Sequence, residues 1–298
     1  MLKCLLWGSG KVLLDNIKLA KYYEALGQYK ICAITARNLT YSQFDNIPCI
    51  LSNQINPIDY DIIIIMSHNY VSSIIEDAQN MGFKEEVIIP IKVLKLLGFD
   101  TNKYLKIKSN PPSIICSNCW GGVAYNALGL QFASPFINMF EDPLDYIKII
   151  NNLEHYMRQD ITLDHMQYEP TLKTNYPVAW CDDVLLHFNH YTDFDDAKSC
   201  WERRKKRINW DNLLFVMYES DPNIAAEFSK AKPNNKFCFT SFPSDDSNHC
   251  YINLVEDDKL SKLPFWELFL GTASGKYPYF DIFEFLTTNS INLVTSVK

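Results

Sequence analysis

The sequence predicts an α/β protein with an N-terminal Rossmann-like domain, built on a parallel sheet, and a second, less regular α/β domain. Strand-like and helix-like segments alternate through residues 1–99, which is the pattern of βαβ units. The glycine turn Gly8-Ser9-Gly10 directly follows the first apolar run, and a turn at that place lets backbone N–H groups approach a phosphate. The chain of 298 residues is longer than one α/β unit usually is, so we expect two domains.

The elements of the first domain, residues 1–99, follow from their apolar patterns. Apolar runs predict strands at residues 2–7, 30–35, 49–51, 61–67 and 86–89. Segments that stop at glycine predict helices at residues 11–26, 71–81 and 90–98. The run Ile62-Ile63-Ile64-Ile65 has no polar alternation, so we expect a central strand that is covered on both faces.

Residues 100–112 are polar, bounded by prolines and without periodicity, which predicts a linker. The second domain then covers residues 113–298. Its expected strands lie at residues 113–116, 136–139, 177–188, 212–218 and 236–241. Its expected helices lie at residues 122–128, 143–157, 194–207 and 224–230. The aromatic-rich segments 263–269 and 277–283 are expected to form core or a contact through which the protein oligomerises.

Composition limits the partners and the compartment. A net charge of −7 gives no general attraction to nucleic acid or to an anionic membrane surface. Nine scattered cysteines, an odd number, are typical of reduced thiols rather than of a disulfide framework. The apolar run before Gly8 is too short for a signal peptide, and no apolar run reaches transmembrane length. We therefore expect a cytoplasmic protein that binds neither nucleic acid nor membrane.

The first candidate site is the turn formed by Gly8, Ser9 and Gly10, which is placed to hold a phosphate. Leu13 stands where the full dinucleotide fingerprint has Gly or Ala, and the second strand ends near Arg37 without the acid that would hold a ribose. Ordinary NAD binding is therefore disfavoured, whereas Arg37 can accept an additional phosphate or the diphosphate of a nucleotide sugar. Residues 67–69 are expected to face the same crevice. The alternative is a turn that needs glycine for steric reasons alone.

A second glycine loop, Cys116-Ser117-Asn118-Cys119-Trp120-Gly121-Gly122, joins a strand to a helix. It places Cys119 near a helix N-terminus, where the pKa of a thiol is lowered, so Cys119 is a candidate nucleophile. Ser117, Asn118, Gly121 and Gly122 are expected to cradle an anion. A single Cys-x-x-Cys pair is poor evidence for zinc, and a buried structural cysteine is the alternative.

Carboxylates and imidazoles gather between residues 182 and 190. If a strand runs through residues 184–188, alternation places Asp183 and His187 on one face. Such a pair can act as a general base with its orienting acid, or as ligands of a metal whose identity is unknown, and His190 is a further catalytic candidate. The alternative is a hydrogen-bonded core histidine.

Arg204 falls on the apolar stripe of the expected helix 194–207. A buried arginine calls for an anionic partner, because an unpaired buried charge is costly. Asp182 or Asp183, another structural salt bridge and a ligand phosphate all remain open as that partner.

A string of motifs in the second domain resembles a bacterial domain family of unknown function, some of whose members are labelled exopolysaccharide biosynthesis proteins. The motifs are Ser117-Asn118-Cys119-Trp120-Gly121-Gly122, Leu128-Gly129-Leu130, Ser134-Pro135-Phe136-Ile137-Asn138, Asp182-Asp183-Val184, His187-Phe188-Asn189-His190-Tyr191 and Trp201-x-Arg203-Arg204-x-x-Arg207-Ile208-Asn209. The first domain looks like the small Rossmann-like module attached to sugar-modifying transferases. No catalytic residues are carried over from either resemblance.

The resemblance implies an enzyme of bacterial cell-surface polysaccharide biosynthesis, a glycosyl or acyl transferase that acts on a nucleotide-linked or phosphorylated sugar. Its cofactor is unknown, and a nucleotide sugar or other phosphate-bearing ligand is expected. A non-catalytic nucleotide-sugar-binding or assembly protein of the same pathway is the alternative. An NAD(P)-dependent oxidoreductase is disfavoured by Leu13 and by the missing acid.

Overall fold

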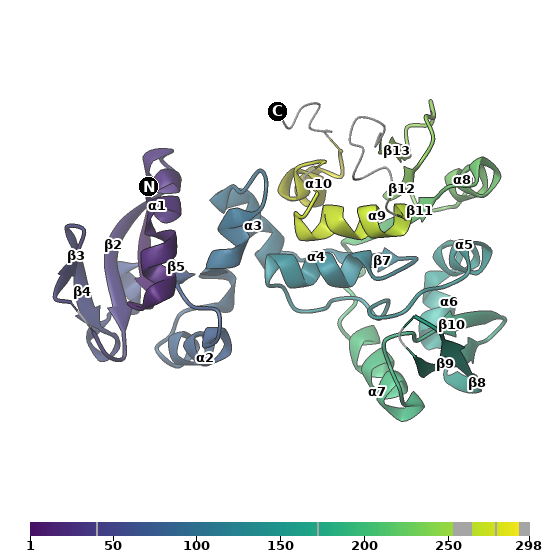
Figure 1. The fold of residues 1–298 in the computed structure, drawn as a ribbon, viewed down its shortest axis with the longest axis horizontal. Coiled ribbons are helices and arrows are strands. Elements are labelled where there is room, and N and C mark those ends of the chain that lie inside the picture. Colours follow the sequence, from purple (N-terminus) through teal and green to yellow (C-terminus); the bar gives the residue numbers. More distant parts are fainter. Residues whose placement is uncertain (40, 172, 253–263, 278, 292–298) are drawn as a thin grey trace. The chain divides into compact units, whose positions relative to one another are not determined.

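The computed structural model describes the chain except for residues 40, 172, 253–263, 278 and 292–298. Residue contacts divide it into two compact units, an N-terminal unit Met1–Ser109 and a C-terminal unit Asn110–Lys298. Both units are α/β, and their elements are labelled in Figure 1. No helix among the described residues is long and apolar enough to cross a membrane.

The N-terminal unit is built on one sheet with the strand order β3-β4-β2-β1-β5-β6. Its parallel strands are β1 (Leu2–Trp7), β2 (Tyr29–Ala36), β4 (Ile47–Leu51), β5 (Ile62–Ile65) and β6 (Ile88–Pro90). The short β3 (Gln43–Phe44) pairs antiparallel with β4. All four isoleucines of β5 are fully buried, as their uninterrupted run predicts.

The helices of the N-terminal unit are α1 (Lys11–Ala25), α2 (Val71–Asn80) and α3 (Thr101–Ser109). The expected helix at 90–98 is instead a short 3-10 helix, Ile91–Lys95. α3 lies inside the segment that we expected to be a linker without regular structure. Thr101 donates to Gln28 Oε1 through its backbone N–H at 2.9 Å, and Tyr104 and Ile107 are buried. The contacts of α3 with residues distant in the sequence therefore outweigh the poor periodicity of its segment.

The C-terminal unit contains two sheets. A parallel sheet has the order β13-β12-β11-β7, and an antiparallel sheet has the order β10-β9-β8. The strands of the parallel sheet are β7 (Ser113–Cys116), β11 (Leu213–Glu219), β12 (Lys236–Thr240) and β13 (His249–Tyr251). The strands of the antiparallel sheet are β8 (Ile161–Glu169), β9 (Thr174–Cys181) and β10 (Val184–His187).

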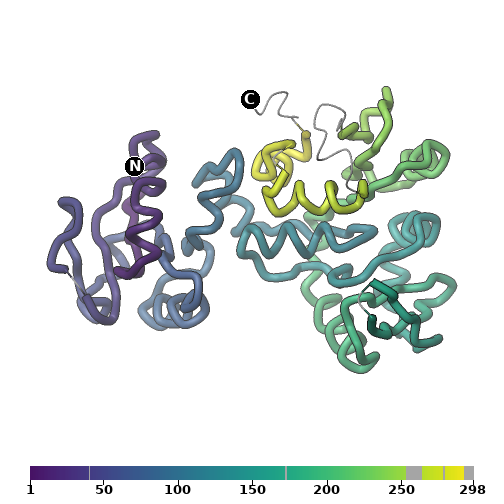
Figure 2. Tube along the Cα trace, in the orientation of Figure 1, coloured from purple at the N-terminus to yellow at the C-terminus, as the bar shows by residue number. Residues whose placement is uncertain are grey.

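The helices of the C-terminal unit are α4 (Trp120–Leu128), α5 (Pro143–Asn151), α6 (Leu153–Arg158), α7 (Phe194–Lys205), α8 (Pro222–Ser229), α9 (Phe265–Ser274) and α10 (Ile282–Thr288). α4 and α9 lie side by side (Figure 2). Trp120 of α4 stacks on Phe269 of α9 with ring centroids 5.8 Å apart, and it donates to Thr272 Oγ1 at 3.0 Å. Much of the C-terminal aromatic-rich region is therefore core, although Leu263 and Pro278 lie outside the described residues.

Two strand predictions in the C-terminal unit are wrong. Residues 136–139 have no regular structure and are held by the burial of Phe136, Ile137 and Met139. The expected strand 177–188 is a hairpin, because the chain reverses at residues 182–183, where Asp182 adopts a φ of 55°. Strand β8, which was not expected, is mostly exposed and therefore lacks an apolar pattern.

Candidate functional site

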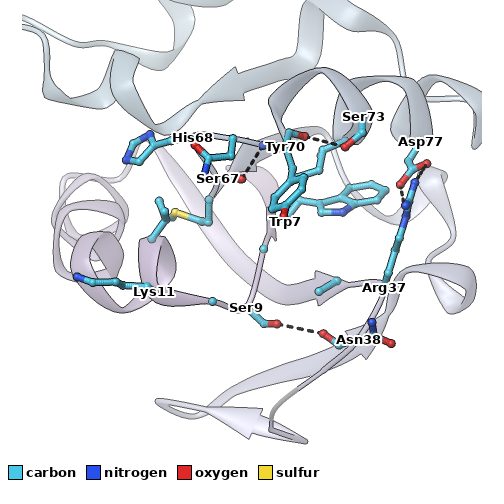
Figure 3. A pocket seen from close by; sticks show the side chains of 17 residues that line it. Trp7, Ser9, Lys11, Arg37, Asn38, Ser67, His68, Tyr70, Ser73 and Asp77 are labelled. Carbon is cyan, nitrogen blue, oxygen red and sulfur yellow. Dashed lines mark hydrogen bonds and ion pairs between the residues drawn. The ribbon is translucent and has the colours of Figure 1, made fainter.

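A pocket of about 540 Å³ lies in the N-terminal unit, at the carboxyl ends of β1, β2 and β5. The turn Gly8–Gly10, the start of α1 at Lys11, Arg37 and residues 67–70 all line it. The close-up in Figure 3 shows Lys11 and His68 on one side of the pocket and Arg37 with Asp77 on the other. The residues predicted for the phosphate site are thus brought together, at the edge of a parallel sheet where α/β proteins place their ligands.

Gly8 is required by the geometry of the turn. Its φ is +129°, and a Cβ there would lie 2.6 Å from the Met66 carbonyl oxygen. Its N–H donates to Thr35 O at 2.7 Å, which ties the end of β1 to β2. Gly8 is therefore required for steric reasons. This requirement is compatible with binding of a phosphate at the turn.

Gly10 is the N-cap residue of α1 and has no side chain to satisfy the first N–H groups of the helix. A Cβ at Gly10 would meet no atom within 4 Å. Because Gly10, Lys11 and Val12 line the pocket, the positive end of α1 opens onto it. This end of the pocket is suited to an anion.

Arg37 is engaged by a carboxylate that the sequence did not reveal. Its Nε and Nη2 donate to the two oxygens of Asp77 at 2.9 and 2.7 Å. These hydrogen bonds raise the pKa of the guanidinium. Asp77 comes from α2, 40 residues further along the chain. Arg37 is consequently not a free phosphate ligand, and the pair presents both donors and acceptors.

In the C-terminal unit, the loop after β7 leads into α4 as predicted, with Cys119 as the N-cap residue. Asn118 Oδ1 accepts from the Trp120 N–H at 2.9 Å and so occupies one of the helix donors itself. Cβ atoms at Gly121 and Gly122 would lie 3.2 Å from Ile114 and Ile137 side chains. The two glycines therefore allow α4 to pack closely against Ile114 and Ile137.

The predicted lowering of the Cys119 pKa is wrong. Burial, and to a smaller extent the nearby Glu141 carboxyl, raises the pKa of this thiol to about 11. Its Sγ lies 3.8 Å from the Met139 carbonyl oxygen. The desolvation of the thiolate thus exceeds the effect of the helix N-terminus.

The structure does not bring Asp183 and His187 together. Asp183 lies in the turn before β10, where it accepts from the Tyr156 hydroxyl at 2.8 Å, and this bond lowers its pKa. His187 stacks on Phe140 with ring centroids 4.6 Å apart, its Nε2 lies 4.0 Å from Asp142 Oδ2, and burial lowers its pKa. His190 is exposed. The reversal at residues 182–183 explains why the alternation does not reach Asp183.

Arg204 is buried, as its place on the apolar stripe predicts, and its partners within the protein are not the acids that were expected. Nη1 donates to the Tyr191 hydroxyl at 2.7 Å and to the Ile137 carbonyl at 3.2 Å, and the guanidinium lies 5.2 Å from the centre of the Phe132 ring. Within the described part of the chain it forms no salt bridge with Asp182, Asp183 or another acid. Its positive charge is therefore balanced by dipoles and by an aromatic ring.

Sequence reasoning also missed Glu141. This residue is 4% exposed, and neither carboxyl oxygen has a hydrogen-bond partner among the described residues. It precedes Asp142 and Pro143 at the start of α5, where an acid is usually exposed, so its burial had no signal in the sequence. Among the described residues, no group of three or more His, Cys, Asp or Glu side chains is arranged to hold a metal ion.

Residues 90–287 match the model of a family described as a domain of unknown function, DUF1919. The chain belongs to this family. Residues 1–89 match a second model, described as C2185-like, N-terminal. An uncharacterized protein of Haemophilus influenzae is 30% identical over 141 residues, which cover 46% of this chain and 66% of that protein, just under two thirds of its length.

The two matches divide the candidate residues between them. The DUF1919 region contains Cys119, Glu141, Asp183, His187 and Arg204. The pocket beside the glycine turn falls entirely in the C2185-like region.

Proposed function

We propose that this protein is a transferase of bacterial cell-surface polysaccharide biosynthesis, and that its N-terminal pocket binds the phosphate-bearing part of a nucleotide-linked or phosphorylated sugar. The observation that carries the binding proposal is the pocket itself, in which the glycine turn and the open end of α1 face a cavity of about 540 Å³. The parallel order β4-β2-β1-β5-β6 supports a Rossmann-like module. The volume is within the range of small-molecule sites.

The two sides of the pocket suit the two ends of such a ligand. Lys11, beside the N-terminus of α1, provides a positive charge on this side, although it also contacts Asp15 at 3.1 Å, and the His68 ring lies on the same side. Backbone N–H groups there can hold phosphate oxygens. On the other side, the Arg37–Asp77 pair offers donors and acceptors for the hydroxyl groups of a ribose.

A matched pair of substitutions tests the phosphate site. Gly10→Asp places a carboxylate in open space at the N-cap of α1, where it supports the helix and repels a phosphate. Gly10→Ser supports the helix without the charge. We expect a thermal-shift screen of nucleotide sugars, coenzyme A, NAD and NADP to yield a ligand whose apparent Kd rises at least about tenfold in Gly10→Asp and less than about threefold in Gly10→Ser.

Two results would contradict the binding proposal. One is a screen in which none of the phosphate-bearing compounds shifts the melting temperature of the wild type. The other is a ligand whose affinity is unchanged in Gly10→Asp. A response to NAD or NADP alone would instead support an oxidoreductase.

The reaction and the pathway rest on the resemblance of the motifs between residues 117 and 209 to exopolysaccharide biosynthesis proteins. Asp183→Asn and His187→Ala test catalysis: a transferase that uses these groups loses the glycan product in cells at normal protein levels. The separate partners of Asp183 and His187 favour the second candidate, a non-catalytic nucleotide-sugar-binding or assembly protein. Unchanged glycan composition in both variants would support that candidate.

A further inference from the structure

Two buried polar side chains without partners lie at the carboxyl end of β7, in the C-terminal unit. Glu141 is 4% exposed and Ser117 is 6% exposed. Neither carboxyl oxygen of Glu141 nor the hydroxyl of Ser117 has a hydrogen-bond partner among the described residues. Buried polar groups are almost always satisfied, so an unsatisfied pair calls for a bound partner.

Backbone contacts hold these two residues next to each other. The Glu141 N–H donates to the Ser117 carbonyl at 3.4 Å, and the Ser117 N–H donates to Val216 O at 3.1 Å. Two residues earlier, the Met139 carbonyl lies 3.8 Å from Cys119 Sγ. The segment 139–141 therefore runs along the loop 117–119. This loop follows a parallel strand, which is where α/β folds place their ligands.

The surroundings of Glu141 favour the neutral form of its carboxyl over the ionised form. Burial raises its pKa well above the usual value, and the charges of Asp142 and Asp145 raise it further. No salt bridge to Glu141 is formed by a described lysine, arginine or histidine. A neutral carboxyl both donates and accepts hydrogen bonds, as a serine hydroxyl does. The two aspartates also repel anions, so a phosphate does not fit here.

We infer that Glu141 and Ser117 form a second ligand site, which binds an uncharged, hydroxyl-bearing molecule of the sugar class. Each sugar hydroxyl is both a donor and an acceptor, so vicinal hydroxyls match the neutral carboxyl and the serine hydroxyl. Cys119 is the partly exposed member of the loop 117–119 and marks its solvent side. The choice of a sugar among hydroxyl-bearing molecules rests on the proposed function; the site itself does not.

Calorimetric titration of the full chain with uncharged monosaccharides and their methyl glycosides tests the inference. Glu141→Gln keeps one donor and one acceptor, so we expect the Kd of the bound sugar to change less than about threefold. Glu141→Met keeps the size and removes both, and Ser117→Ala removes the hydroxyl. We expect each of these two variants to weaken binding by about tenfold or more. Glu219→Gln is the matched control, because Glu219 ends the neighbouring strand and already accepts from the backbone of residues 220 and 221.

Glu141→Met is expected to fold, because an apolar side chain replaces a buried group that lacks a partner. The inference is overturned if no sugar binds to the wild type, which would mean that the two groups hold only an ordered water. It is also overturned if Glu141→Met binds sugar as the wild type does. A ligand that is bound only in its cationic form would equally contradict it.

The same variants separate this inference from the proposed function. If sugar binding depends on Glu141 while no phosphate-bearing compound responds to Gly10→Asp, the proposed function fails and the second site stands. If nucleotide binding is weakened by Gly10→Asp but not by Gly10→Ser, and no uncharged sugar binds, the second site is refuted and the proposed function stands.

Discussion

At the scale of single residues, the proton on Glu141 makes the stability of the fold depend on pH. Its pKa is raised in the folded state by burial and by Asp142 and Asp145, from an ordinary value of 4.5. The folded protein therefore holds this proton at a pH at which the unfolded chain has lost it. The stabilising contribution is complete below pH 4.5 and is lost as the pH rises toward the folded pKa.

Glu141→Gln removes this dependence. We compare the free energy of unfolding of the variant with that of the wild type. The difference is expected to shift in favour of the variant by about 1.4 kcal/mol for each pH unit above 4.5, until the pKa of Glu141 in the folded state is reached. Urea denaturation of both proteins from pH 5 to about pH 8 measures the difference. Glu219→Gln controls for the loss of a carboxylate. Parallel curves for Glu141→Gln and the wild type would show that Glu141 is ionised in the fold.

Cys119 gives a second prediction at this scale. Because burial raises its pKa to about 11, its thiolate is scarce at neutral pH. We expect the rate of its alkylation by iodoacetamide to rise about tenfold per pH unit between pH 7 and pH 10. Mass spectrometry of the peptide that contains Cys119 measures this rate. A rate that levels off near pH 8 would mean that the Cys119 thiol is already ionised at that pH. Cys119 would then be the reactive cysteine that its position at the N-terminus of α4 predicts.

At the scale of elements, the close packing of α4 depends on its glycines. A Cβ at Gly122 would lie 3.2 Å from the Cγ2 of Ile137, which is 1% exposed. Gly122→Val adds three carbons at this contact, so we expect it to destabilise the protein by about 1–3 kcal/mol.

A double-mutant cycle tests whether this contact is the cause. Ile137→Ala alone is expected to cost about 2–5 kcal/mol, because it leaves a cavity. The valine at position 122 can use that space, so the double variant should lose less free energy of unfolding than the two single losses together. Denaturation of the four proteins gives the coupling. Simple additivity would mean that Gly122 does not contact Ile137.

At the scale of the whole molecule, the limit of the N-terminal unit depends on α3. Contacts place the end of this unit at Ser109, whereas the sequence pattern placed it at residue 99. Tyr104 and Ile107 of α3 are buried, and the Lys108 ammonium donates to the Ile88 carbonyl at 2.8 Å. Desolvation lowers the pKa of Lys108 to about 8.

A pair of fragments tests this limit. We expect residues 1–109 to unfold cooperatively, and residues 1–99 to be less stable by about 3–6 kcal/mol, because they lose the burial of two large apolar side chains. Denaturation followed by circular dichroism measures both. Equal stabilities would mean that α3 is not part of the unit. The fragment 1–109 should also keep the nucleotide response of the full chain, because it contains every residue that lines the pocket.

The sequence pattern correctly predicted the elements that depend on residues close together in the chain. Ile62–Ile65, the glycine turn and the helix after it were all found where the sequence placed them. The pattern failed where distant residues decide the structure, as in α3, in the irregular segment 136–139 and in the exposed strand β8.

The sequence by itself determined an α/β protein with a glycine turn at the first strand, because apolar runs and glycine act over a few residues. Only the tertiary structure decided which polar groups meet. Asp77 reaches Arg37 across 40 positions, and Ser117 and Glu141 lie together without partners. The burial of a carboxyl and the choice of its neighbours depend on how distant segments pack, which no local pattern encodes.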